Sequence, residues 1–174
     1  MSLRDKLIAT AIEEIETNAG GVISLREFSR KAGVSEAAPY RHFKNRAELL
    51  GAVAAEGFKM LHTSLLALDA IERPTKQALF EVFECFARSH GALYDLMHRL
   101  DPGKSAPITE HLTEALATFR LLAHLVSKSR PGLDETAIEL LAYACWSEFH
   151  GRVMIEQAGL IPPHVRDKMA ALTF

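Results

Sequence analysis

The fold is decided by residues 24–43, which read SLREFSRKAGVSEAAPYRHF. Ser24 and Glu27 have the spacing of a capping box, in which a serine hydroxyl and a glutamate carboxylate satisfy each other's backbone amides at a helix start. Gly33 then permits the sharp turn, with a positive φ, that a second helix needs. Two short helices joined by such a turn form a helix-turn-helix, whose second helix, here Glu36 to His42, has the size to enter the major groove of DNA.

The rest of the chain also follows the helical period, because apolar residues recur three and four positions apart. Asn45 and Glu48 repeat the capping-box spacing and open a long helix. With the two helices above, the expected helices span about residues 3–18, 46–70, 78–86, 92–99, 108–127, 134–157 and 163–173. We therefore predict an all-α fold of about nine helices, with a three-helix DNA-binding domain at residues 1–46 and a larger helical domain at 47–174.

The composition is that of a soluble globular protein, with 24% charged and 48% hydrophobic residues. No stretch approaches the roughly 20 apolar residues that span a bilayer, and the first residues do not form a leader, so we expect the protein in the cytoplasm. Cys85 and Cys145 each have aromatic neighbours, which is typical of buried, reduced thiols.

The charge is unevenly distributed along the chain. Between Arg26 and Arg46 there are six basic and two acidic residues, a charge of +4, whereas residues 51–174 carry 12 basic and 15 acidic residues, a charge of −3. A basic surface on an acidic body suits DNA, because neutralisation of phosphates supplies most non-specific affinity. An ordinary solvated face would give the same count.

Several of these residues are shared with a known family. Residues 32–35 (AGVS), 38–43 (APYRHF) and 46–50 (RAELL) lie at the offsets of TetR-family regulators, which the sequence resembles over residues 4–60. Trp146 with His150 and Gly151 resembles the C-terminal domain of the subgroup named for its Trp-His-Gly signature. The resemblance implies a homodimer that represses transcription from a partly palindromic operator until a small molecule releases it.

The resemblance also implies which residues contact DNA. Tyr40 and His42 match positions that bind phosphates, and Ser24 and Arg46 flank them. With the base-reading face and one further cation, the predicted set is Ser24, Ser35, Glu36, Ala37, Ala38, Tyr40, Arg41, His42, Lys44 and Arg46.

Pro39 departs from the family pattern, in which leucine is the usual residue. Proline has no N–H to donate to the Ser35 carbonyl, so one helical hydrogen bond is lost. We therefore expect a slightly distorted recognition helix and leave the base contacts open.

In the family, the larger domain encloses a pocket whose ligand shifts the long helix and releases DNA. Apolar and aromatic residues with a few polar groups predict a small, largely apolar effector, although most such residues also form an ordinary core. The candidate lining is Phe58, Leu61, His62, Phe83, Phe86, His90, Tyr94, Met97, Phe119, Leu122, Trp146 and His150. We assign dimerisation to the last two helices, at about 134–157 and 163–173, because their apolar residues exceed what one face can bury.

Other functions are weakly supported by the sequence. The five histidines from His90 to His150 form no pair three or four residues apart, so we expect no metal site. No nucleophile elbow, phosphate-binding loop or dinucleotide motif occurs, so we expect neither an enzyme nor a cofactor. The alternative is a helical dimer that has lost DNA binding and acts as a ligand-binding or interaction module.

Overall fold

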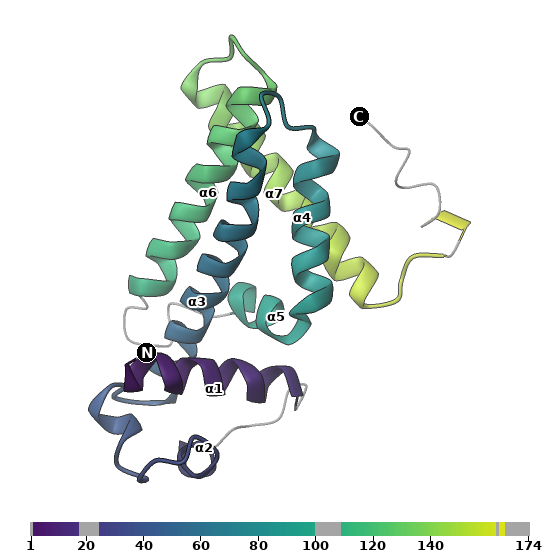
Figure 1. Ribbon diagram of the computed structural model, residues 1–174. Helices are drawn as coiled ribbons and strands as arrows, with labels where there is room; N and C mark the ends of the chain where they lie inside the picture. Colours follow the sequence, from purple (N-terminus) through teal and green to yellow (C-terminus); the bar gives the residue numbers. More distant parts are fainter. Residues whose placement is uncertain (1, 18–24, 100–108, 163, 166–174) are drawn as a thin grey trace. The chain divides into compact units, whose positions relative to one another are not determined.

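The structure is a computed structural model that describes residues 2–17, 25–99, 109–162 and 164–165 (Figure 1). These residues form seven α-helices and two short 3₁₀ helices and contain no strand, which confirms the all-α prediction. Most of the predicted last helix, 163–173, lies outside the described residues.

The chain divides into two compact units. Unit 1 comprises Met1–Met60 and His90–Leu116, and unit 2 comprises Leu61–Ser89 and Ala117–Phe174. Two helices, α3 (Arg46–Leu66) and α6 (Thr109–Ser129), contribute residues to both units. The predicted domain boundary at residue 46 stays a prediction.

In unit 1, α1 (Leu3–Thr17) packs beside both α2 (Leu25–Lys31) and α5 (Gly91–Arg99). The inner face of α1 buries Leu7, Ile8 and Ala11, as its amphipathic pattern predicts. The Glu16 carboxylate accepts hydrogen bonds from the backbone amides of Ala92 and Leu93, at 3.4 and 3.0 Å. Since the first amides of a helix have no partner within it, this carboxylate caps α5 and fixes it to α1.

The turn after α2 has the geometry that its glycine predicts. Gly33 has a φ of +66°, and its amide donates to the Arg30 carbonyl at 3.2 Å. The next amide, of Val34, donates to the Ser29 carbonyl at 3.0 Å, which completes a Schellman motif. The predicted capping box at the start of α2 lies outside the described side chains.

The segment after this turn differs from the prediction. Residues 36–38 form turns and Pro39–Arg41 form a 3₁₀ helix, η1, so the predicted α-helix over 36–42 is wrong. Because Pro39 has no amide hydrogen, the Ser35 carbonyl accepts instead from Ala38, one residue earlier, at 3.0 Å. The His42 amide likewise donates three residues back, to Pro39, at 3.0 Å. The missing donor therefore changes the helix type of this segment and does more than distort it.

The next helix, α3, begins where the second capping-box spacing predicts. The Asn45 side chain accepts from the Glu48 amide at 2.9 Å, and the Glu48 carboxylate accepts from the Lys44 amide at 2.6 Å. The helix continues into the 3₁₀ helix η2 (Ala67–Ala70), which confirms the long helix predicted over 46–70.

Unit 2 contains α4 (Lys76–Ser89) and α7 (Glu135–Gln157), which lie side by side (Figure 1). Thr75 caps α4, since its hydroxyl accepts from the Ala78 amide at 3.1 Å. Pro74 precedes this cap. Asp134 caps α7 by accepting from the Ala137 amide at 2.8 Å.

The two cysteines are free, but they differ in burial. Cys145 is buried, as predicted, whereas Cys85 is exposed, so its predicted burial is wrong. The buried face of α4 includes Phe83 and Phe86. Cys85 lies two residues after Phe83, which turns it to the opposite side of a helix with 3.6 residues per turn. Among the described helices, none is both long and apolar enough to cross a membrane.

Candidate nucleic-acid interface and effector residues

Most of the side chains predicted to contact DNA lie on an exposed face in unit 1. Ser24 is outside the described residues, and Ala38 is only 9% exposed and belongs to the buried side of its segment. Tyr40 is 57% exposed, so its ring is not a core aromatic. The other exposed members are Ser35, Glu36, Ala37, Arg41, His42, Lys44 and Arg46.

Residues 35–46, which carry these exposed side chains, pack against the rest of unit 1 through their apolar side chains. Phe43 is 1% exposed, and the Arg4 guanidinium lies 5.4 Å from the centre of its ring, within the range of a cation–π contact. Arg4 also donates to the Glu110 carboxylate at 2.6 Å. With Phe43 and Pro39 turned inward, the neighbouring polar side chains are presented to solvent.

The cationic side chains in this part of unit 1 differ in whether a carboxylate pairs with them. Lys31 forms an ion pair with Glu14. Among the described residues, no carboxylate forms an ion pair with the side chain of Arg41 or Lys44. Neither cation would therefore lose an ion pair with a described carboxylate on contact with a phosphate.

The twelve predicted effector residues are all described, but they fall into both units. Phe58, His90, Tyr94 and Met97 belong to unit 1, and the other eight belong to unit 2. In unit 2, the ring of Trp146 lies 6.1 Å from Phe83 and 5.9 Å from Phe119. The partly exposed members are His62, His90, Phe119, Trp146 and His150, and the rest are buried.

In unit 1, two histidines that sequence reasoning left out of the effector set lie beside Phe58. Its ring centre is 5.7 Å from that of His98 and 5.4 Å from that of His111. His111 Nε2 lies 2.9 Å from the Met97 carbonyl, whereas its buried Nδ1 has no hydrogen-bond partner among the described residues. Burial also raises the pKa of the nearby Tyr94 hydroxyl. The sequence held a signal for His98, which follows Tyr94 by four residues and so shares its helix face.

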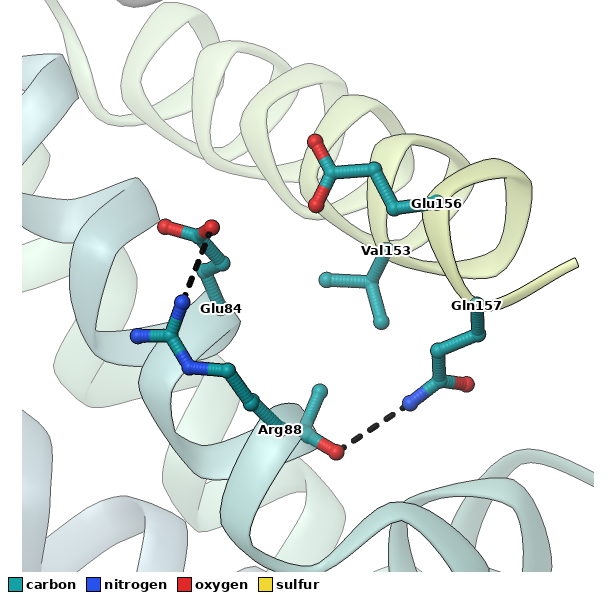
Figure 2. A pocket seen from close by; sticks show the side chains of 6 residues that line it. Glu84, Arg88, Val153, Glu156 and Gln157 are labelled. Atoms are coloured by element: carbon teal, nitrogen blue, oxygen red, sulfur yellow. Dashed lines mark hydrogen bonds and ion pairs between the residues drawn. The ribbon is translucent and has the colours of Figure 1, made fainter. Parts of the chain in front are cut away.

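Unit 2 also forms a pocket of about 260 Å³ between α4 and α7 (Figure 2). Two polar contacts lie within its wall, since Arg88 pairs with Glu84 at 3.5 Å and the Gln157 amide donates to the Ala87 carbonyl at 3.1 Å. None of the twelve predicted effector residues lines this pocket. The described residues also contain no group of three histidine, cysteine or acidic side chains that could hold a metal ion.

An exposed basic segment that follows a short helix and a glycine turn, with further helices after it, is typical of helix-turn-helix regulators. Residues 7–53 match the family described as bacterial regulatory proteins of the tetR family, and residues 77–173 match the tetracyclin repressor-like C-terminal domain. The chain belongs to the TetR family and is a DNA-binding transcriptional regulator. The Trp-His-Gly subgroup stays a prediction.

Solved structures share this fold. A protein of unknown function from Rhodococcus sp. RHA1 is 28% identical, with a TM-score of 0.73 over 92% of this chain and 86% of that chain. The TetR regulatory protein from Mycobacterium vanbaalenii is 24% identical, with a TM-score of 0.55 over 90% and 93%. A transcriptional regulator from Aquifex aeolicus is 15% identical, with a TM-score of 0.61 over 89% and 86%. A search of curated proteins finds no match.

Proposed function

We propose that the protein is a repressor that binds a palindromic operator as a homodimer in the cytoplasm and is released by a small, largely apolar effector. The observation that carries the proposal is the exposed polar face over residues 35–46, held to unit 1 by the buried ring of Phe43. The family assignment supports both the DNA target and the dimer.

Within this face, the side chains have different roles at the DNA. The Tyr40 hydroxyl and the His42 imidazole donate hydrogen bonds to phosphate oxygens, which fixes the register of the protein. Arg41, Lys44 and Arg46 neutralise phosphates and supply affinity that does not depend on sequence. Base edges are left to Ser35, Glu36 and Ala37, which are exposed just before η1.

The dimer is proposed to form through α7 and the predicted helix at 163–173. On α7, Leu140 is 65% exposed and Tyr143 is 67% exposed, and their spacing of three residues places them on one face. A second copy of the same face would cover both. A Tyr143→Asp variant is expected to sediment as a monomer at micromolar concentration, whereas wild type sediments as a dimer. Identical sedimentation of the two proteins would contradict this interface.

The effector is proposed to contact the aromatic and histidine set. The Phe83, Phe119 and Trp146 rings of unit 2 offer apolar contacts to such a molecule. Because α3 follows directly on the DNA-facing segment and contributes to both units, a shift of this helix can change the presentation of that segment.

The experiment that tests DNA binding compares wild type with a Tyr40→Ala, His42→Ala double variant. Fluorescence anisotropy on DNA that flanks the coding sequence should show salt-sensitive binding by wild type. The double variant should bind roughly 10- to 100-fold more weakly, since it loses hydrogen bonds to charged phosphates. Arg120→Ala, which removes an exposed cation from α6 in unit 2, is the control and should bind as wild type does. Equal affinity of the double variant and wild type would refute the phosphate contacts.

The 3₁₀ geometry of Pro39–Arg41 favours one alternative, a helical dimer that has lost operator binding and acts as a ligand-binding or interaction module. The same titration separates the two proposals. Absence of specific, salt-sensitive binding by a folded wild-type protein would support the alternative.

A further inference from the structure

Unit 2 forms a second pocket, with a cavity volume of about 360 Å³, where α4 begins and α6 ends. Its floor is apolar. Leu79, Val126 and Cys145 are buried, and Leu141 of α7 is half-buried beside them. Burial raises the pKa of the Cys145 thiol, which therefore stays neutral and serves as part of the apolar floor.

The rim of this pocket is cationic. Arg73, Lys76 and Arg130 line it, and its lining contains no acidic residue. Lys76 is held by Glu148 at 2.5 Å. Within the part of the chain that the structure describes, no carboxylate forms an ion pair with Arg73 or Arg130.

The contrast with the pocket in Figure 2 indicates which of the two is built for an anion. That pocket includes the carboxylates of Glu84 and Glu156, and its arginine is paired within the wall. In the second pocket, the exposed guanidinium groups of Arg73 and Arg130 lie at the rim of an apolar floor and pair with no described carboxylate. The helix dipoles do not explain this difference in charge between the two pockets. The N-terminus of α4, which is partially positive, and the C-terminus of α6, which is partially negative, both line the second pocket, so their effects on an anion are opposite in sign.

We propose that this pocket binds an amphipathic monoanion, namely a carboxylate on a short apolar chain. The apolar chain would cover Leu79, Val126 and Leu141, and the carboxylate would accept hydrogen bonds from Arg73 and Arg130. At the roughly 30 Å³ that a water molecule occupies in the liquid, the cavity holds about a dozen non-hydrogen atoms, the size of a medium-chain carboxylate. The site shares no residue with the predicted effector set, and the proposal does not depend on DNA binding.

The test is a calorimetric titration of the full chain with three probes of equal chain length. Octanoate is expected to bind, whereas octan-1-ol and octylamine should bind at least about tenfold more weakly, because only the carboxylate can pair with the guanidinium groups. Equal binding of octan-1-ol and octanoate would overturn the proposal, as would the absence of octanoate binding at millimolar concentration.

A matched pair of variants locates the site. Arg73→Gln with Arg130→Gln should weaken octanoate binding by about tenfold or more and leave octan-1-ol binding unchanged. Arg120→Gln removes a comparable exposed cation from α6, outside the pocket lining, and should bind octanoate as wild type does. All three positions are exposed, so these variants are expected to fold. Equal loss of binding in both proteins would overturn the assignment to this pocket.

A second readout uses the thiol on the floor. In a Cys85→Ser background, Cys145 is the remaining cysteine, and octanoate should slow its alkylation by a maleimide severalfold, while octylamine should not. Alkylation at the same rate with and without saturating octanoate would place the bound molecule elsewhere and overturn the proposal.

Discussion

The segment at residues 35–46 of unit 1, which is proposed to bind DNA, and the aromatic cluster of unit 2 contrast in both backbone and burial. The segment combines turns with a 3₁₀ helix, and its polar side chains are exposed. The cluster lies on regular helices, where the ring centre of Phe149 is 5.3 Å from that of Phe83 and 5.7 Å from that of Phe80. The contrast indicates that the side chains proposed to bind DNA contribute little to folding, whereas the buried rings of the cluster stabilise the fold.

The largest expected effect is in the cluster. Phe149 is fully buried, so Phe149→Ala should lower the free energy of unfolding by about 3–5 kcal/mol through lost burial and the cavity it leaves. Urea denaturation followed by circular dichroism, at one fixed protein concentration, measures this loss. Tyr40→Ala in the same experiment should change stability by less than about 0.5 kcal/mol, because Tyr40 is exposed. A loss of similar size in the two variants would contradict the proposed difference between the cluster and the exposed segment.

A smaller effect is expected at a close contact inside unit 1. A Cβ atom on Gly57 of α3 would lie 2.6 Å from the Met97 Sδ and 3.1 Å from the Leu93 Cγ. Overpacking costs about 1–3 kcal/mol, and replacing glycine within a helix returns about 1 kcal/mol. Gly57→Ala should therefore destabilise the protein by up to about 2 kcal/mol, measured by the same denaturation. Gly151→Ala is the control, since a Cβ there meets no described atom within 4 Å beyond the adjacent backbone of its own helix, and it should be neutral or stabilising.

A still smaller change in the free energy of unfolding is expected for Pro39→Ala, whose main effect should be on the backbone conformation. Pro39→Ala supplies an amide that can donate to the Ser35 carbonyl, so residues 36–42 should become α-helical. Carbon chemical shifts of this segment should move toward α-helical values, while the free energy of unfolding changes by less than about 1 kcal/mol. Unchanged shifts would show that an interaction other than the missing amide sets the 3₁₀ geometry.

The sequence predicts this molecule well wherever neighbouring residues decide the geometry. Gly33 and Asn45 define a turn and a helix start through contacts within five residues, and both are found as expected. The missing donor of Pro39 is also visible in the sequence, but the slight distortion predicted from it was too small a change, because 3₁₀ hydrogen bonds replace the α-helical pattern at both Ala38 and His42. The exposed surface was predictable from family offsets, apart from the burial of Ala38.

The second pocket of unit 2 could not be predicted from the sequence. Arg73 and Arg130 are far apart in the sequence, and each has ordinary local surroundings. They line one cavity only because α4, α6 and α7 pack against one another there. Tertiary packing creates such a site, so no residue spacing or periodicity in the sequence predicts it.

The smallest expected effect is at Asp69, an exposed residue of η2 that belongs to neither compared region. Hydrogen bonds from Lys128 and His124, each at 3.0 Å, hold the pKa of this carboxyl below its usual value of 3.8. A depressed pKa in the folded state stabilises the protein above the unfolded pKa, and this contribution is lost as the pH falls through the folded value. Asp69→Asn should therefore lower the melting temperature slightly at about pH 6, and it should have no effect at a lower pH, below the folded pKa, where the carboxyl is protonated in both states. A difference that persists at the lower pH would show that the amide loses a neutral hydrogen bond and that the charge contributes little.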